Sequence, residues 1–556
     1  MQSHADIIVT HGRVLTMDAA RPRAEALAIA GNTILAIGST AEIAAWRGPA
    51  TRVIDAQGGT VLPGFNEGHL HLFTGSAELE QLHLFGVKGF EALSAAVRRF
   101  AAERPDEPLL IGQSADYTIL SDTHRVTRHD LDRIIAERPF IMFAPDHHTA
   151  WANTAALEFG GVLQGRRLGP GNEIVMAEDG LAAGELREME AFQPVIERGA
   201  SGARERLGLS TGGEPDPAPS PAERARDRAT IRRGLAYCAS LGITSLQNMD
   251  GNFYQLDLID ELAQAGDFLC RARVPFHFKS FMDLDALDKA EAMRERYASE
   301  RLRSGFVKLF IDGVLDGWTA VMVEDYADRP GWRGEPLFPA ERFDAIATEA
   351  DRRGLQIAVH AIGDGAVRMV LDGYAAARRA NGPRDSRHRI EHIEVIHPDD
   401  IPRFAELGVV ASMQPPHPPG SMGLPLEPTV SRIGEARWPH AYAWNTLRAA
   451  GARMVFATDW PVSPLDPIGS IQAAMVRQPW KPGLPDHRQT LMQALASYTA
   501  ESAHVEFMET RKGRLLPGLL ADVVVLGGDL EATEAEALHT VRPVATICDG
   551  VMTFGG

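Results

Sequence analysis

The stretch LQIAVHAIGDGAVRMVLDGYAAARRANGPRDSRHRIEHIE, residues 355–394, contains two apolar runs separated by a helical segment. LQIAVHAI and RIEHIE have the composition of buried strands, whereas the residues between them are typical of a helix. A strand, a helix and a second strand in this order indicate a βαβ unit with parallel strands. We therefore expect an α/β fold around this stretch.

Eight apolar runs of this kind alternate with helical segments along the chain. In order they are GFNEGHLH (64–71), ITSLQNMD (243–250), RARVPFHF (271–278), FVKLFI (306–311), LQIAVHAI (355–362), RIEHIE (389–394), VVASMQP (409–415) and RMVFATDWP (453–461). Eight strand–helix units predict a closed (β/α)8 TIM barrel, in which the chemistry lies at the C-terminal ends of the strands.

The two ends of the chain differ from this pattern. Residues 5–62 read as short strands broken by turns, and GLLADVVVLGGD (518–529) and VRPVATICDGVMTFGG (541–556) have the same character. Chain ends often lie close together, so we expect both ends to pair into one small sheet domain. The predicted boundaries are 1–62 and 513–556 for this domain, and 63–512 for the barrel.

The first and second predicted strands are too far apart for one helix to connect them, so residues of about 76–235 are predicted to be an insertion. Within it, residues 201–228 are rich in Pro, Gly, Ser and charge, which indicates a mobile loop. A second Pro-rich stretch, residues 415–428, follows the seventh strand and is expected to act as a lid over the barrel mouth.

Composition excludes several classes of protein. The chain has 56 basic and 74 acidic residues, a net charge of −18, which argues against nucleic acid as a partner. Three scattered cysteines indicate a reducing compartment, and no signal peptide or membrane span is found. We expect a cytoplasmic protein with no membrane contact that acts on a small molecule, and a homo-oligomer is compatible with the sequence.

Histidine and aspartate side chains gather at the predicted strand ends. His69 and His71 are two residues apart, so both imidazoles project from one face and can bind one metal ion. With 19 histidines in 556 residues, about 0.65 such pairs arise by chance, so the pair alone is weak evidence. His360, His392 and Asp459 also end apolar strands, where a polar group is costly unless it is hydrogen-bonded or metal-bound. Together they predict a metal site.

Lys308, in FVKLFIDG, is the unusual member of this set because its ammonium group would repel a metal ion. A buried lysine can lose its proton. The neutral amine can then add carbon dioxide to become a carbamate, which can bridge two metals. The structural alternative is an ion pair with Asp312, four residues further along the strand.

The chain resembles the amidohydrolase superfamily, and within it the YtcJ-like group that includes N-substituted formamide deformylases. The resemblance rests on VLPGFNEGHLH, APDHHTAWANTAAL, GELRE, VKLFIDG, VHAIGDGAV, RIEHIEV, ASMQPPH, ATDWPVSPLDP, SYTAESA and GLLADVVVL. It implies a distorted barrel with a small β-sandwich formed from both chain ends, and a centre of one or two metal ions, usually zinc.

The resemblance also implies a role for each ligand. His69 and His71 would bind the more buried ion, His360 and His392 the more exposed one, and the carbamate of Lys308 would bridge them. Asp459 would contact the first ion and transfer protons. Two positions depart from the usual pattern: Glu67 replaces the usual Asp, and Trp460 follows Asp459, where smaller residues are common.

Seven further residues are candidates for roles in catalysis, ligand orientation or substrate binding. His148 is a candidate catalytic donor, and Glu188 and Asp312 are candidates for orienting the ligands. Each could equally be an ordinary surface, structural or salt-bridge residue. Four residues are expected to line an apolar substrate pocket, with core packing as the alternative: Phe73, Trp318, Trp460 and, in the lid segment, His417.

The predicted reaction is hydrolysis of a C–N amide-type bond by metal-activated water, with Asp459 as general base and then general acid. N-formyl, N-acyl, carbamate or cyclic amide compounds with a hydrophobic or aryl group are the expected substrates. A metal-dependent deaminase is the first alternative, but no Glu follows His360, and Lys308 is present. A catalytically inactive regulatory homologue is the second, although it has no physical reason to keep six costly polar residues.

Overall fold

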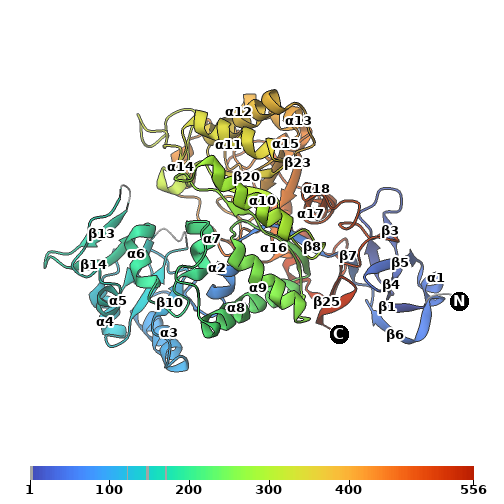
Figure 1. Cartoon of the computed structure of the whole chain (residues 1–556), viewed down its shortest axis with the longest axis horizontal. Helices are drawn as coiled ribbons and strands as arrows, with labels where there is room; N and C mark the ends of the chain where they lie inside the picture. The colour runs from blue at the N-terminus through green and yellow to red at the C-terminus, as the bar shows by residue number, and fades with distance from the viewer. Residues whose placement is uncertain (1–3, 122, 146–148, 170–171, 556) are drawn as a thin grey trace. The chain divides into compact units, whose positions relative to one another are not determined.

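The computed structural model describes residues 4–121, 123–145, 149–169 and 172–555. The chain forms two compact units (Figure 1). The first contains Met1–His71, Thr211–Gly213 and Leu235–Gly556, and the second contains Leu72–Ser210 and Glu214–Gly234. All of the predicted strand ends that carry metal-ligand candidates belong to the first unit.

The first unit contains the parallel strands. All eight predicted runs contain a strand, and the run at 271–278 contains two. The strands are β8 (Phe65–Leu70), β15 (Ile243–Asn248), β16 (Arg271–Arg273), β17 (Phe276–His277), β19 (Phe306–Phe310), β20 (Gln356–Ala361), β21 (Arg389–His392), β22 (Val410–Met413) and β23 (Arg453–Phe456). With the short β18 (Leu302–Arg303) they form two parallel sheets, ordered β18-β16-β15-β8 and β17-β19-β20-β21-β22-β23. The predicted α/β class is confirmed.

The hydrogen-bonded ladder differs from the closed ring that eight runs predict. Pro275 lies between β16 and β17, and because proline has no N–H group it interrupts the ladder there. At the other end, β8 and the segment after β23 meet in one isolated parallel bridge between Leu70 and Trp460. These parallel strands therefore form two sheets, and no closed barrel is detected among the described residues.

Helices alternate with these strands, as the sequence predicts. Among them are α9 (Phe253–Gln264), α10 (Leu287–Arg296), α11 (Ala340–Arg352), α12 (Asp364–Asn381), α13 (Arg403–Leu407), α15 (Trp444–Ala449), α16 (Pro467–Val476), α17 (Leu491–Tyr498) and α18 (Ala500–Val505). Every residue of β20 is buried, as expected for parallel strands that are covered on both faces. None of the helices in the described part of the chain combines the length and the apolar character that a membrane crossing requires.

The two ends of the chain share a sheet in the first unit, where the blue and red strands of Figure 1 meet. Its order is β26-β25-β24-β7-β2-β3, formed by β2 (Arg13–Leu15), β3 (Arg23–Ala24), β7 (Thr60–Pro63), β24 (Val523–Leu526), β25 (Pro543–Cys548) and β26 (Val551–Gly555). A second sheet contains β1 (Ala5–Thr10), β4 (Ala26–Ala30), β5 (Thr33–Gly38) and β6 (Arg47–Asp55). One buried apolar cluster joins residues of both sheets, including Val9, Leu27 and Val525.

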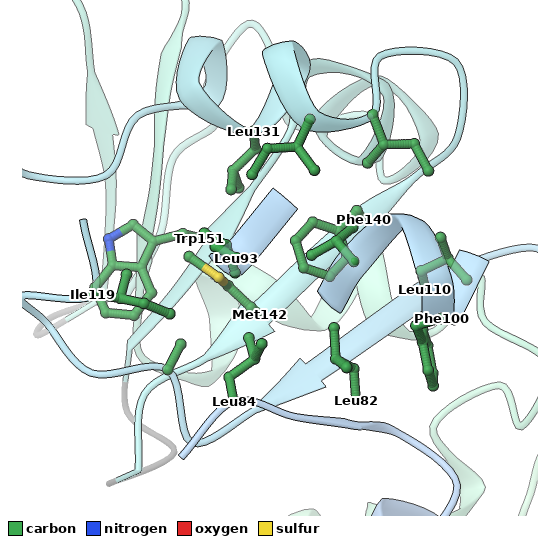
Figure 2. Close-up of a cluster of buried hydrophobic side chains, with 14 of the residues drawn as sticks. Leu82, Leu84, Leu93, Phe100, Leu110, Ile119, Leu131, Phe140, Met142 and Trp151 are labelled. Carbon is green, nitrogen blue, oxygen red and sulfur yellow. The ribbon is translucent and has the colours of Figure 1, made fainter. Parts of the chain in front are cut away.

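The second unit has its own mixed sheet, ordered β13-β14-β12-β11-β10-β9. Its strands are β9 (Leu82–His83), β10 (Leu110–Gln113), β11 (Phe140–Phe143), β12 (Thr149–Ala152), β13 (Glu173–Met176) and β14 (Ala182–Arg187). Alternate residues of β11 enter different apolar clusters because successive side chains point to opposite faces. Phe140 and Met142 join Trp151 in one cluster (Figure 2), and Ile141 and Phe143 join another.

The stretch 201–228, predicted to be a mobile loop, is partly helical. It contains a 3-10 turn at Arg204–Arg206, α7 (Leu207–Ser210) and the start of α8 (Pro221–Ser240). Ser220 and Glu223 exchange hydrogen bonds between side chain and backbone at the start of α8. With proline at the first helical position, these are the signals that begin a helix.

Candidate metal centre

His69, His71 and Asp459 form the centre of a buried polar cluster in the first unit. His69 Nε2 lies 3.2 Å from Asp459 Oδ1, and His71 Nε2 lies 3.4 Å from the same oxygen. Their ligand atoms all lie within 4.8 Å of one another. One metal ion placed among them could contact all three side chains.

His392 and His417 face the other oxygen of Asp459. His392 Nδ1 lies 3.9 Å and His417 Nε2 lies 3.8 Å from Asp459 Oδ2, and these three residues form a second group with metal-ligand spacing. The sequence assigned His417 to substrate binding, whereas the structure places it within reach of a metal position. His360 stands beside this group, with its ring 4.6 Å from that of His392.

The backbone is unusual at two of these positions. Asp459 has φ of 60° and His392 has φ of 77°, in the left-handed region that residues other than glycine seldom adopt. Such conformations persist only where surrounding contacts hold them, and they cluster at functional sites. Here they turn the side chains of the strand ends toward the cluster.

Lys308 is fully buried on β19, next to the cluster. Its Nζ has no hydrogen-bond partner among the described residues, and it lies 4.5 Å from the centre of the Phe310 ring. Burial lowers the pKa of the Lys308 ammonium to about 8, although Glu391 and Asp459 act in the opposite direction. The alternative of a Lys308–Asp312 ion pair is not seen in the part of the chain that the structure describes.

Asp312 has a different set of partners. Its carboxylate accepts hydrogen bonds from the backbone N–H groups of Val321, Ile362 and Gly363, at 2.9–3.0 Å. Its Oδ1 also lies 3.6 Å from His360 Nε2, which in turn is 3.0 Å from the carbonyl oxygen of Gly313. Asp312 therefore holds the loops around His360 in place.

Glu391 and Arg389 support His69, and the sequence analysis missed both. Glu391 Oε2 lies 2.7 Å from His69 Nδ1, which leaves Nε2 of that ring directed toward Asp459. Arg389 is fully buried and donates to Glu391, Gln247, Ser412 and the carbonyl of Gly68. Carboxylates behind metal-binding histidines commonly fix the tautomer and orientation of the ring.

Asp250 supports the ring of His71 in the same way, and the sequence analysis missed it as well. Its Oδ1 lies 3.0 Å from His71 Nδ1, and its Oδ2 accepts a hydrogen bond from Gln255 at 2.8 Å. Asp250 ends the second predicted strand, ITSLQNMD, so its position at a strand end was the available signal. His71 thus lies between Asp250 and Asp459.

Glu67, where Asp is usual, points to the neighbouring strand end. Its Oε1 accepts hydrogen bonds from the backbone N–H and the hydroxyl of Thr458, at 2.6 and 3.1 Å. Burial raises the pKa of this carboxyl to about 8. The longer side chain therefore ties β8 to the segment after β23.

The other predicted site residues lie in both units of the chain. Trp460 is buried, and its carbonyl accepts a hydrogen bond from the His71 N–H at 2.7 Å. Trp318 packs against the guanidinium of Arg432, 3.7 Å from its ring centre. Phe73, in α2 (Leu72–Glu78), and Glu188, which precedes α6 (Met189–Ile196), belong to the second unit. His148 lies outside the described residues.

The charge balance of the cluster suits a dication. Burial alone would raise the pKa of Asp459, but His69, His71 and His392 hold it well below its ordinary value, so the carboxylate is ionised. Burial lowers the pKa of His360 to about 3, and that of His392 well below its ordinary value, so both rings are neutral and can act as ligands. Asp459 Oδ1 accepts no hydrogen bond from the described residues. This donor set fits a divalent metal such as zinc.

Comparison with known proteins gives consistent results. The chain is 28% identical over 540 residues to Protein LONG AFTER FAR-RED 3 of Arabidopsis thaliana, covering 94% of this chain and 87% of that protein. It is 26% identical to the Putative amidohydrolase YtcJ of Bacillus subtilis (strain 168), with 98% of each chain covered. It is 23% identical to the N-substituted formamide deformylase of Arthrobacter pascens, over all of this chain and 99% of that protein.

A solved structure and a family model extend this result. An uncharacterized metal-dependent hydrolase from Pyrococcus furiosus superposes with a TM-score of 0.71 at 27% identity, covering 93% of this chain and 98% of that one. The family model described as "Amidohydrolase family" matches residues 52–554. The resemblance proposed from the sequence motifs is confirmed, and the chain belongs to the amidohydrolase family.

Proposed function

We propose that the protein hydrolyses a C–N amide-type bond of a small substrate at a metal centre built around Asp459. The observation that carries this proposal is the position of that carboxylate, whose two oxygens face two separate groups of histidines. N-formyl, N-acyl, carbamate and cyclic amide compounds with a hydrophobic or aryl group are the substrate classes. Membership of the amidohydrolase family and the similarity to a formamide deformylase support this choice.

The residues that would hold the metal are those at the ends of the parallel strands. His69 and His71 would bind one ion together with Asp459, while His360 and His392 would bind a second. When bound, zinc in such a site supplies activation of water and polarisation of a carbonyl. Asp250 and Glu391 would keep the imidazoles of His71 and His69 aligned from behind.

Lys308 would complete the centre as a carbamate. The ammonium first releases one proton. The neutral amine then forms a C–N bond with carbon dioxide at Nζ and releases a second proton, so a carbamate anion replaces the cation. The buried Nζ without a hydrogen-bond partner supports this, because a charged ammonium would be costly there. The carbamate oxygens would then serve as ligands for the metal.

Asp459 would transfer the proton. Its depressed pKa keeps it ionised at neutral pH, so it can accept a proton from the attacking water. It would then give that proton to the departing amine. His417 Nε2, buried and with no hydrogen-bond partner among the described residues, would donate to an oxygen of the substrate.

The tryptophans predicted from the sequence would form the apolar part of the substrate pocket. Trp460 would line the pocket beside His71, and Trp318 would contact the apolar part of the substrate. We also propose that the eight strands form a distorted (β/α)8 barrel over 63–512, with an insertion at about 76–235 and a β-sandwich domain of 1–62 and 513–556.

A hydrolysis screen tests the function. Zinc-loaded protein is offered N-formyl, N-acyl, carbamate and cyclic amide libraries, and the released amine or acid is measured. We expect at least one substrate class to turn over. Asp459→Asn should then lower kcat by at least about 100-fold, because the proton carrier is lost, with the metal content largely retained. Asp399→Asn is the matched control because Asp399 is 80% exposed.

Other outcomes would contradict the proposal. Release of ammonia from amino-purines or cytosine-like compounds, without amide hydrolysis, would indicate a deaminase. A protein that binds no metal under any supplementation would be a regulatory homologue. Turnover by Asp459→Asn equal to that of the parent would remove Asp459 from proton transfer.

A further inference from the structure

A cavity of about 330 Å³ lies at the opposite end of the parallel strands from the metal centre. Gly305, which precedes β19, and Gln356, which begins β20, line it. The cluster residue His360 comes four residues after Gln356, which is about 13 Å along an extended strand. The cavity and the metal centre are therefore separate sites of the first unit.

Four arginines line this cavity: Arg273, Arg294, Arg303 and Arg384. Two acidic residues, Asp385 and Glu506, line it as well. The lining thus has an excess of positive charge in a chain whose net charge is −18. Such a concentration of guanidinium groups attracts anions.

The two acidic residues are already bound to other groups. Glu506 pairs with Lys512 at 2.6 Å and accepts a hydrogen bond from Asn66 at 2.5 Å, in addition to its contact with Arg303 at 2.9 Å. Asp385 pairs with Arg387 at 2.8 Å, and Arg387 does not line the cavity. Neither lining carboxylate therefore neutralises the arginines fully, although Arg384 also pairs with Asp351 at 2.7 Å and Arg294 with Glu291 at 3.3 Å.

Two of the guanidinium groups lie close to the backbone of Gly354. A Cβ atom placed on Gly354 would lie 3.3 Å from Arg384 Nη1 and 3.6 Å from Arg294 Nη1. Because glycine has no such atom, this space belongs to the cavity. Arg384 donates to Ser386 and Asp351 through Nε and Nη2, which leaves Nη1 for this space, whereas Arg294 Nη1 also donates to the carbonyl oxygen of Arg353 at 2.7 Å.

A third guanidinium lies deeper. Arg273 is 5% exposed, and its guanidinium carbon lies 4.5 Å from the centre of the Phe306 ring. Burial lowers the pKa of Arg273 to about 9, and the nearby Arg303 adds to this effect. Glu506 acts in the opposite direction, and a bound anion would relieve the remaining repulsion between these cations.

We propose that this cavity binds a phosphate-bearing small anion, either inorganic phosphate or a phosphate ester. Arginine side chains bind phosphate oxygens through pairs of N–H donors, and charge-assisted bonds of this kind are strong. Donors that approach from several sides suit a tetrahedral anion better than a planar carboxylate. The bound anion stabilises the N-terminal ends of the parallel strands and takes no part in the chemistry at their C-terminal ends.

Thermal unfolding of the zinc-loaded full-length protein tests the proposal. Sodium phosphate, titrated at constant ionic strength with sodium chloride, should raise Tm in a saturable way, because ligand that binds the folded state stabilises it. The variant R294Q/R384Q should lose most of this shift. R23Q is the matched control, since Arg23 is an exposed arginine paired with Glu531 in the terminal sheet and should leave the shift unchanged.

A second measurement needs no variant. Phenylglyoxal modifies accessible arginines, and peptide mapping should show that phosphate slows the modification of Arg294 and Arg384 several-fold, with Arg23 unaffected. A Tm shift that survives in R294Q/R384Q would place the phosphate elsewhere, including at the metal centre, and would overturn the proposal. A shift with malonate but none with phosphate would overturn the ligand class.

Discussion

Lys308 differs from every other member of the metal cluster because it brings a positive charge where a dication is expected. Its Nζ has no partner among the described residues, and burial lowers its pKa to about 8. We therefore expect protein prepared with ¹³C-labelled bicarbonate to show a carbamate carbon signal in NMR spectra. Lys308→Met should abolish this signal. In metal-free protein the signal should weaken as the pH falls to about 6, because only the neutral amine reacts with carbon dioxide.

Lys279 offers a matched control for this experiment. Burial also lowers its pKa to about 8, but Glu391 and Asp459 of the cluster act on the pKa of Lys308, whereas burial is the one cause of the shift at Lys279. Lys279→Met should leave the carbamate signal unchanged. A signal that disappears in Lys279→Met and persists in Lys308→Met would show that the carbamate forms at a different lysine.

The sequence analysis named His69, His392 and Asp459, which the structure brings close together, and Asp312, which lies beside His360. It missed Glu391, Arg389 and Asp250. His69, His392 and Asp459 are recognisable because a polar residue that ends an apolar run is rare and costly. Glu391 lies within such a run, beside His392, and nothing in the sequence says that it contacts His69, 322 positions earlier. Contacts of this kind depend on which strands become neighbours, and side-chain patterns alone do not specify that.

Few backbone contacts join β8 to the segment after β23. The side chain of Glu67 therefore contributes to holding these two elements together. Its carboxyl has a pKa raised to about 8 by burial, against an ordinary value of 4.5. Between these values the folded protein holds a proton that the unfolded chain has released. The free energy of unfolding must then fall as the pH rises through this window.

Glu67→Gln should remove this pH dependence, since an amide does not titrate but can still accept from Thr458. We expect the stability of Glu67→Gln relative to the parent to rise by at least about 1 kcal/mol between about pH 5 and pH 8.5. Urea unfolding of metal-free protein measures it. Glu406→Gln, on the exposed side of α13, is the control. A difference that stays constant with pH would mean that Glu67 is ionised in the folded protein.

Elements were predicted well where the pattern is long and regular, and less well where one residue changes it. The eight apolar runs all contain strands, but Pro275 divides the third into β16 and β17 because it cannot donate a hydrogen bond. The start of α8 was predicted as part of a loop because residues 201–228 are rich in Pro, Gly and Ser, although Ser220, Pro221 and Glu223 carry the local signal of a helix start. Single positions of this kind outweigh the average character of a segment.

In the first unit, the parallel strands and the terminal sheet are joined by one buried ion-pair network. Arg271 of β16 contacts Asp522 at 2.7 Å and Asp549 at 2.7 Å, and all three side chains are about 4% exposed. Arg301 adds a more exposed contact to Asp549. These partners are separated by more than 200 positions, so the sequence could predict that both chain ends pair, but not that β16 anchors them.

Arg271→Met should therefore destabilise the first unit by about 3–5 kcal/mol, because it leaves the buried Asp522 without its cation and Asp549 with only the more exposed Arg301. Chemical denaturation followed by circular dichroism measures the loss. Arg453→Met is the control: its pair with Glu501 is 53% and 26% exposed, and such a pair contributes about 0–1 kcal/mol. If Asp522→Asn is added to Arg271→Met, part of the stability should return, because one uncompensated charge is removed. Equal losses for Arg271→Met and Arg453→Met would mean that apolar contacts between the sheets, rather than this network, hold the chain ends to β16.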